Sequence, residues 1–172
     1  MSNISVNIKG LGIQNLHKGI TPLQIMVDTK EVSKDSIICK VNGELTDLSA
    51  QLLNDCDLQF MDAKSKDGHS VLLHSTAHLM AQAVKRLFPE TKVTIGPFLE
   101  NKFYYDFDVK TPFSEEDLKR IEEEMYNISN ENLDIIHEEK SRDEALKFFD
   151  QIGEDYKVEI INDLDKNEIL KV

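Results

Sequence analysis

The chain has 172 residues, enough for one domain or two small ones, and an apolar fraction of 40% that can supply a packed core. No apolar run approaches the roughly 20 residues that a membrane helix needs, and the N-terminus lacks the pattern of a signal peptide. The net charge of −12 excludes nucleic-acid binding by bulk positive charge, so any such contact must be local. Two cysteines outside any disulfide pattern fit a reducing compartment, and we expect a cytoplasmic protein that makes no membrane contact.

Residues 1–63 predict a small α+β module. Alternation of apolar and polar residues indicates strands, threonine before proline starts a helix, and Asn-Gly between apolar runs is typical of a hairpin. The expected elements are a strand at 4–8, a glycine turn and a second strand, a helix from Thr21-Pro22, a hairpin around Asn42-Gly43, and a strand at 57–61. This order indicates a β-grasp, ubiquitin-like fold, and the pattern itself offers no catalytic constellation.

Residues 64–68 are polar and end in glycine, and we interpret them as a linker. Residues 69–172 predict a second α+β domain. Its expected elements are a helix after the linker that stops before Pro89, strands at 92–95 and 103–107, a helix from Ser114, a strand at 133–138, a helix from the capping box at Ser141, and a strand at 156–161.

The first of these helices carries His74 and His78, which four-residue spacing places on one face. Two neighbouring imidazoles can bind a metal, activate water or hold a substrate. Successive residues of a helix are rotated by about 100°. The side of the helix opposite the histidines therefore holds the expected stripe of core residues. Lys85 lies on the histidine side, where two small alanines would leave room for a cleft. The stripe is Leu72, Thr76, Leu79, Met80, Ala83 and Leu87, and the alanines are Ala77 and Ala81. An unspecialised solvated face fits this pattern equally well.

A metal site needs more ligands than this pair, since zinc takes three or four. The remaining candidates, His17, His69, His137, Cys39 and Cys56, follow no metal-ligand spacing. Ser75 stands where the HExxH pattern requires glutamate. We therefore expect no metal and no cofactor in this chain.

Four segments in order, at 74–78, 95–97, 103–107 and 156–158, resemble the editing domain of threonyl-tRNA synthetase. The preceding residues, including 41–45 and 57–59, resemble the TGS domain that opens that enzyme. The resemblance covers nearly the whole chain. It implies a TGS domain at 1–63, the linker at 64–68, and at 69–172 an editing domain of the threonyl/alanyl-tRNA synthetase type that is truncated at its C-terminal end.

The resemblance implies proofreading, because serine lacks only one methyl of threonine and a synthetic site discriminates such a difference by only about 1–3 kcal/mol. His74 and His78 would position or activate the water that hydrolyses mischarged seryl-tRNA. Lys157 would orient the substrate or stabilise developing negative charge. Gly96 and Tyr105 would shape the pocket around the terminal adenosine. If the family resemblance is set aside, the sequence pattern around Lys157 indicates only an exposed lysine on a strand.

Two departures from the family pattern stand out. Lys102 replaces a common glycine, so a positive φ there would be strained, unless the loop has diverged. The family completes its editing site with an Asp-x-Cys-x-x-x-His element, and the sequence ends at Val172 before one. We therefore expect weak or no deacylation from this chain alone.

For the longer parent, the resemblance implies threonine–tRNA ligase activity with ATP, Mg²⁺ and a zinc ion in the catalytic core, and a homodimer formed through domains outside this chain. The partner expected here is the acceptor end of tRNA. Two alternatives stay open: the TGS-plus-histidine front end of a nucleoside kinase, and a non-catalytic module that binds RNA or protein. The Phe-Tyr-Tyr-Asp run at 103–106 favours the synthetase.

Overall fold

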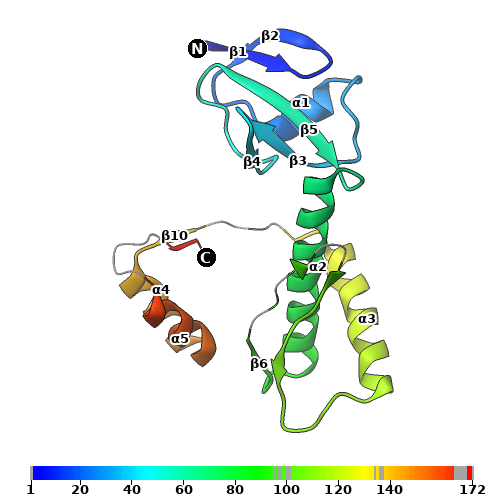
Figure 1. Ribbon diagram of the computed structural model, residues 1–172, viewed down its shortest axis with the longest axis vertical. Helices are drawn as coiled ribbons and strands as arrows, with labels where there is room; N and C mark the ends of the chain where they lie inside the picture. Colours follow the sequence, from blue (N-terminus) through cyan, green and yellow to red (C-terminus); the bar gives the residue numbers. More distant parts are fainter. Residues whose placement is uncertain are drawn as a thin grey trace. The chain divides into compact units, whose positions relative to one another are not determined.

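The computed structural model describes residues 2–94, 96, 98–99, 102–133, 135, 138–164 and 170–171. Its contacts divide the chain into two compact units, Met1–Leu73 and His74–Val172. Helices and strands are interspersed in both units, which confirms the expected α+β class (Figure 1). None of the helices within the described ranges is both long and apolar enough to cross a membrane.

The first unit contains a five-stranded sheet in the order β2-β1-β5-β3-β4. The central strands β1 and β5 are parallel, and the other neighbours are antiparallel. The strands are β1 (Asn3–Ile8), β2 (Gly12–His17), β3 (Ser36–Val41), β4 (Glu44–Thr46) and β5 (Cys56–Asp62). All five were predicted from alternation and turn residues.

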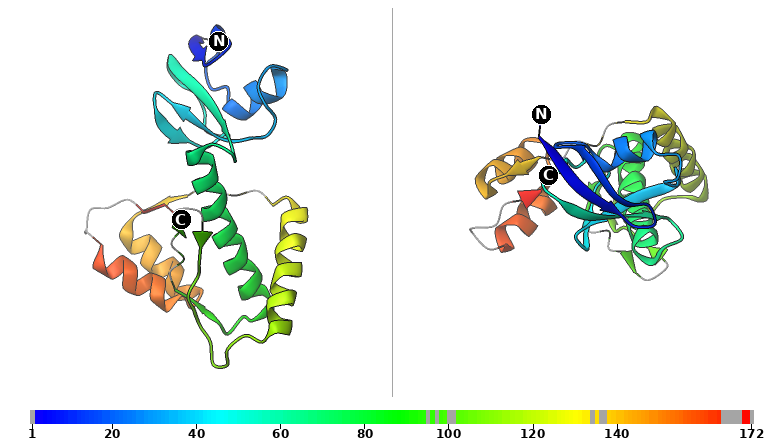
Figure 2. Two further views of the ribbon diagram at one scale, coloured as in Figure 1. Left: turned by 45° about the vertical axis from the view of Figure 1, so that its right-hand side comes forward. Right: turned by 90° about the horizontal axis from the view of Figure 1, so that it is seen from above.

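Helix α1 (Pro22–Asp28) lies across one face of this sheet (Figure 2). It begins where predicted, because the Thr21 side chain accepts a hydrogen bond from the Gln24 backbone and the Gln24 side chain accepts one from the Thr21 N–H. Alternate residues of β1 face the helix and are buried. The core joins Ile4, Val6, Ile8, Ile20, Ile25, Cys39, Leu52 and Leu58.

The predicted hairpin connects β3 and β4 through Asn42 and Gly43. Both residues have positive φ, 51° and 88°, as a two-residue hairpin turn of the type that matches strand twist requires. Asn42 also accepts a hydrogen bond from the Asp57 N–H at 2.9 Å through its side-chain oxygen, which joins the turn to β5.

Helix α2 (Lys66–Leu87) begins earlier than predicted, so three residues of the expected linker at 64–68 belong to the first turn of the helix. Ser65 starts the helix, because its Oγ accepts from the Gly68 N–H at 3.1 Å. Gly68 packs so closely on the preceding turn that an added Cβ would lie 2.7 Å from the Asp62 carbonyl carbon. The polar composition of this segment therefore reflects a helix start. The helix ends before Pro89, as predicted.

The described residues of the second unit form short strands and three further helices. Its strands are β6 (Lys92–Val93), β7 (Phe98–Leu99), β8 (Lys102–Phe103), β9 (Phe107–Asp108), β10 (Glu139–Lys140) and β11 (Leu170–Lys171), which pair antiparallel as β6–β9, β7–β8 and β10–β11. The helices are α3 (Glu115–Glu131), α4 (Arg142–Gln151) and α5 (Asp155–Asp163). Ser114 and Ser141 cap α3 and α4 as predicted.

Three predicted strands differ from the structure. The run 103–107 is split between β8 and β9, with Tyr104–Asp106 in neither strand. In the segment 133–138, the described residues Leu133, Ile135 and Glu138 are not in a strand, and the others lie outside the described residues. The segment 156–161 is helical, in α5.

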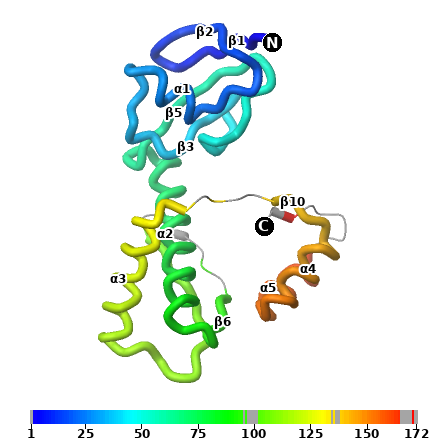
Figure 3. The backbone as a smooth tube through the Cα atoms, turned by 180° about the vertical axis from the view of Figure 1, so that it is seen from behind, coloured from blue at the N-terminus to red at the C-terminus, as the bar shows by residue number. Residues whose placement is uncertain are grey.

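The core of the second unit forms where α2 and α3 run antiparallel to each other (Figure 3). Ala83 and Val84 of α2 pack with Ile121 and Ile128 of α3. Arg86 strengthens this contact through hydrogen bonds to Glu124 and Glu131 at 3.2 and 2.9 Å.

The predicted core stripe of α2 is only partly correct. Ala83 is buried, and Leu79, Met80 and Leu87 pack against the core. Leu72, however, is 43% exposed, whereas Ala77 and Ala81 are buried. The alanines therefore do not leave an open cleft beside the histidines, because other parts of the protein cover them.

Candidate functional site

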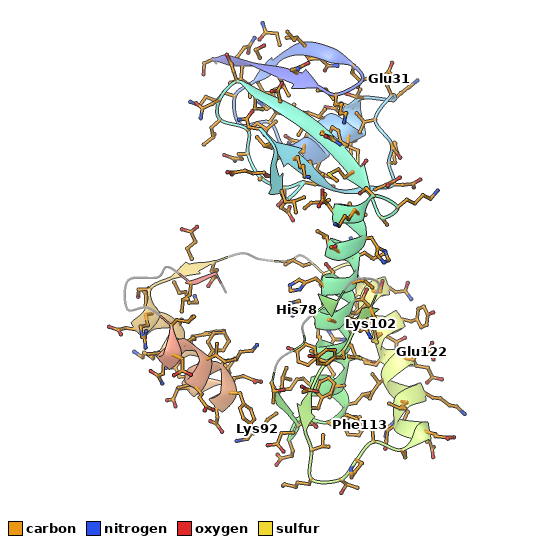
Figure 4. The ribbon with its side chains drawn as sticks, in the orientation of Figure 1. Glu31, His78, Lys92, Lys102, Phe113 and Glu122 are labelled. Atoms are coloured by element: carbon orange, nitrogen blue, oxygen red, sulfur yellow. The ribbon has the colours of Figure 1, made fainter. Side chains whose placement is uncertain are left out.

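His74 and His78 lie one turn apart on α2, as their spacing predicted. The two rings meet edge to face, with centroids 4.5 Å apart and planes at 78°. The Nε2 atoms are 3.0 Å apart, so one carries a proton and donates while the other accepts. Figure 4 shows His78 projecting from the side of α2 that faces away from α3. The pair is solvent-accessible and therefore open to a ligand.

The pKa of His78 is lowered from its ordinary value of 6.5. Partial burial is the largest cause, followed by the positive charges of His74 and Lys157. A lowered pKa keeps the imidazole neutral near pH 7. The neutral imidazole is the form of His78 that can accept a proton.

Lys157 lies on α5, and its predicted place on a strand is wrong. Its ammonium group acts electrostatically on His78 although 79 positions separate the two residues. The backbone N–H of Lys157 donates to the Glu154 carbonyl at 3.0 Å, in the first turn of the helix. The structure thus places His74 and His78 in direct contact, and Lys157 of α5 acts on His78 electrostatically.

Gly96 and Tyr105, the two residues predicted to shape the pocket, are in direct contact. A Cβ on Gly96 would lie 2.7 Å from Cγ of the Tyr105 ring, so only glycine fits there without moving the ring. Tyr105 stacks on Phe107, with centroids 5.1 Å apart and planes at 21°. Burial raises the pKa of the Tyr105 hydroxyl, and the nearby carboxylate of Glu154 raises it further.

Glu154 is the member of this group that the sequence did not reveal. Its carboxylate forms a salt bridge of 3.0 Å with Lys85, and its side chain is only 14% exposed. The same carboxylate acts on Tyr105. The sequence already placed Lys85 on the same side of α2 as the histidines. This positive charge was the one sequence feature that pointed to an acidic partner on that face.

Lys102 carries no left-handed backbone strain. It lies in β8, opposite Leu99. Among described residues other than glycine, only Asn42 and Asn132 have positive φ. Of the two possibilities that the sequence left open, the strained turn is therefore excluded, and Lys102 lies in an extended segment.

No group of three or more histidine, cysteine, aspartate or glutamate side chains within the described ranges could hold a metal ion. His137, one of the candidates considered from the sequence, lies outside the described residues. Burial raises the pKa of the Cys39 thiol to about 12, so this cysteine is not a nucleophile at neutral pH.

A cleft of about 420 Å³ lies elsewhere in the second unit, between the end of α2 and the segment before α3. Phe88 and Phe113 form part of its wall, and the Phe113 side chain is labelled in Figure 4. None of the five candidate residues lines it.

Comparison with known proteins confirms the predicted resemblance, although no protein-family model matches the chain. The chain is 41% identical to a threonine–tRNA ligase of Symbiobacterium thermophilum over 172 residues, 99% of this chain and 26% of that protein. It is 42% identical to the Ehrlichia chaffeensis threonine–tRNA ligase over 170 residues, 98% of this chain and 27% of that protein.

A third relative, the threonine–tRNA ligase of Alkalilimnicola ehrlichii, is 47% identical over 143 residues, 83% of this chain and 22% of that protein. The chain is thus similar to threonine–tRNA ligases over most of its own length. It spans about a quarter of the length of these curated relatives.

Proposed function

We propose that the chain is the N-terminal, proofreading part of a threonine–tRNA ligase, and that its second unit hydrolyses serine wrongly attached to the tRNA for threonine. The observation that supports this proposal most is the direct contact of His74 with His78 on α2, together with the electrostatic effect of Lys157 of α5 on His78. Attachment of threonine with ATP, and the Mg²⁺ and zinc that this requires, would belong to the longer protein. Homodimer formation through other domains, and a cytoplasmic location, are part of the same proposal.

The first unit fits a TGS domain of β-grasp type. Its sheet order, β2-β1-β5-β3-β4, with parallel central strands and one helix across a face, supports that assignment. The candidate catalytic residues lie outside this unit. We therefore assign the chemistry to the second unit, which we propose to be an incomplete editing domain.

The proposed reaction is ester hydrolysis. A water molecule held at the histidine pair attacks the carbonyl carbon of the seryl ester while a neutral imidazole takes its proton. The ammonium of Lys157 stabilises the negative oxygen that forms. The tetrahedral intermediate then collapses, the bond between the carbonyl carbon and the ribose oxygen breaks, and that oxygen receives the proton. The products are serine and uncharged tRNA.

Gly96 and Tyr105 would shape the pocket around the terminal adenosine of the tRNA, because the glycine lets the aromatic ring approach its backbone. A small editing pocket would accept serine and exclude threonine, because the extra methyl group of threonine does not fit. This second selection step adds to the limited discrimination that binding at the synthetic site provides. The tRNA contact would be local, at the acceptor end, because the chain has a net charge of −12.

The test uses the longer parent protein and seryl-tRNA for threonine. Replacing both His74 and His78 with alanine should slow hydrolysis by about 100-fold or more, the usual contribution of general base catalysis. His17→Ala is the matched control, since this exposed histidine lies on β2 in the first unit. An unchanged rate in the double variant would overturn the assignment. It would leave a non-catalytic binding module as the better description of the second unit.

A further inference from the structure

The first turn of α5 is held by side chains from three other elements. The pairs are Glu154 with Lys85 of α2, Asp155 with Lys92 of β6, and Tyr156 with Asp108 of β9. The helix has no side-chain cap at its N-terminus. Tertiary contacts therefore fix the start of this helix, whereas α3 and α4 are fixed by their own serine caps.

The pair between Lys85 and Glu154 is the most protected of the three. Its side chains are 34% and 14% exposed, against 45% and 65% for Lys92 and Asp155. Ion pairs exposed to that extent contribute little, because water and salt screen them. The ammonium of Lys85 also donates to the Thr91 carbonyl at 3.2 Å, which limits its movement.

Lys85 and the histidines occupy the same side of α2. His78 and Lys85 are seven residues apart, which is close to two turns, or about 10 Å along the axis. Lys157 follows Glu154 by three residues and donates its N–H to the Glu154 carbonyl. A helix anchored at Lys85 by Glu154 thus carries Lys157 one turn from its anchor, within reach of the histidine face.

We propose that Lys85 and Glu154 form a positioning pair that docks the first turn of α5 on the histidine face of α2 and so places the Lys157 ammonium beside His78. The catalytic consequence rests on the proposed function. The positioning itself concerns this chain alone, so it can be tested without the longer protein or its substrate.

The experiment is an NMR titration of the His78 ring in the 172-residue chain. Lys157→Met removes a positive charge that lowers the pKa of His78, so it should raise that pKa. Glu154→Gln should also raise it, because Lys157 is released. Loss of the negative charge of Glu154 by itself would lower the pKa of His78. A rise would therefore show that Glu154 acts on His78 by holding Lys157 in place.

Three further variants complete the test. Adding Lys157→Met to Glu154→Gln should give no further rise, because both changes remove the same charge from His78. The exchanged pair, Lys85→Glu with Glu154→Lys, should return the pKa toward its original value. Lys92→Met, which breaks only the exposed pair, is the matched control and should have little effect.

The proposal is overturned if Glu154→Gln leaves the pKa of His78 unchanged or lowers it while Lys157→Met raises it. It is also overturned if Lys157→Met has no effect, since the lysine would then not lie beside His78. Far-UV circular dichroism identifies a variant that has lost its fold. If Glu154→Gln has done so, the pKa of His78 in the exchanged pair, Lys85→Glu with Glu154→Lys, decides whether the proposal holds. If the titrations agree with the proposal but Lys157→Met leaves seryl-tRNA hydrolysis intact in the longer protein, the proposed function fails and the positioning pair stands.

Discussion

The two units of this chain are stabilised by different kinds of contact. The first unit has a five-stranded sheet whose buried core consists almost entirely of aliphatic side chains. The second unit has a smaller buried cluster between α2 and α3, strands of two residues, and a helix, α5, whose start is held by polar pairs. The first unit thus depends mainly on an apolar core, whereas polar pairs contribute more to the second unit, which follows it in the sequence.

This difference explains where the candidate site lies. Ester hydrolysis needs polar groups that water and substrate can reach, and a fully apolar sheet core offers none. The five candidate residues all belong to the second unit. We therefore expect changes to the first core to alter stability without altering the site, and changes to the polar pairs to do the reverse.

The largest expected effect on stability comes from Leu58→Ala in the first unit. Leu58 is 1% exposed on the central strand β5, and its truncation should cost about 2–5 kcal/mol. Urea unfolding, with amide hydrogen exchange to assign the loss to the first unit, measures it. Leu53→Ala is the control, because Leu53 is 50% exposed and should change stability by no more than about 0.5 kcal/mol. A shifted His78 titration in Leu58→Ala would contradict the separation of the two units.

A smaller loss is expected from Gly68→Ala, at the start of α2. Alanine favours a helix over glycine by roughly 0.5–1 kcal/mol, so propensity alone predicts a gain. The added Cβ would instead press on the Asp62 backbone, and overpacking of this kind costs about 1–3 kcal/mol. We expect a net loss in urea unfolding. Gln82→Ala, at an exposed position of the same helix, should be nearly neutral, and a stabilised Gly68→Ala would show that the close packing is not rigid.

The smallest effect is the pH dependence that arises from His78. Its folded pKa lies below the ordinary 6.5 of the unfolded chain, so the unfolded state binds a proton first as the pH falls. Stability from this group is therefore present above pH 6.5 and is lost as the pH falls through the folded value. His78→Gln should reduce the difference in urea midpoint between pH 7.5 and pH 5. An unaltered difference would show that burial of His78 does not affect folding.

Local signals predicted the first unit well. The hairpin was predictable because Asn42 and Gly43 both tolerate the positive φ that the turn needs. Helix α1 was predictable because the Thr21 side chain caps the helix and Pro22, which has no N–H, fits the first helical position. In each case the determining interaction lies within a few residues along the chain.

Non-local contacts explain the failures. The segment 156–161 alternates apolar and polar residues, and so short a run does not distinguish strand from helix. Helix α5 also lacks a cap that could mark its start, since Lys85 and other distant residues hold it. The histidine pair was predictable from its spacing. The direct contact between Gly96 and Tyr105 and the place of Glu154 became visible only in the structure, because residues distant in sequence form them.

The central claim is that the second unit contains a hydrolytic site built from α2 and α5. The most direct measurement compares seryl-tRNA hydrolysis by the longer parent protein with two matched variants, Lys157→Met and Lys147→Met. Lys147 is an exposed lysine of α4 and serves as the control. We predict a loss of about 100-fold for Lys157→Met, the usual result of removing a charge-stabilising group, and an unchanged rate for Lys147→Met. Equal rates for the two variants would contradict the account.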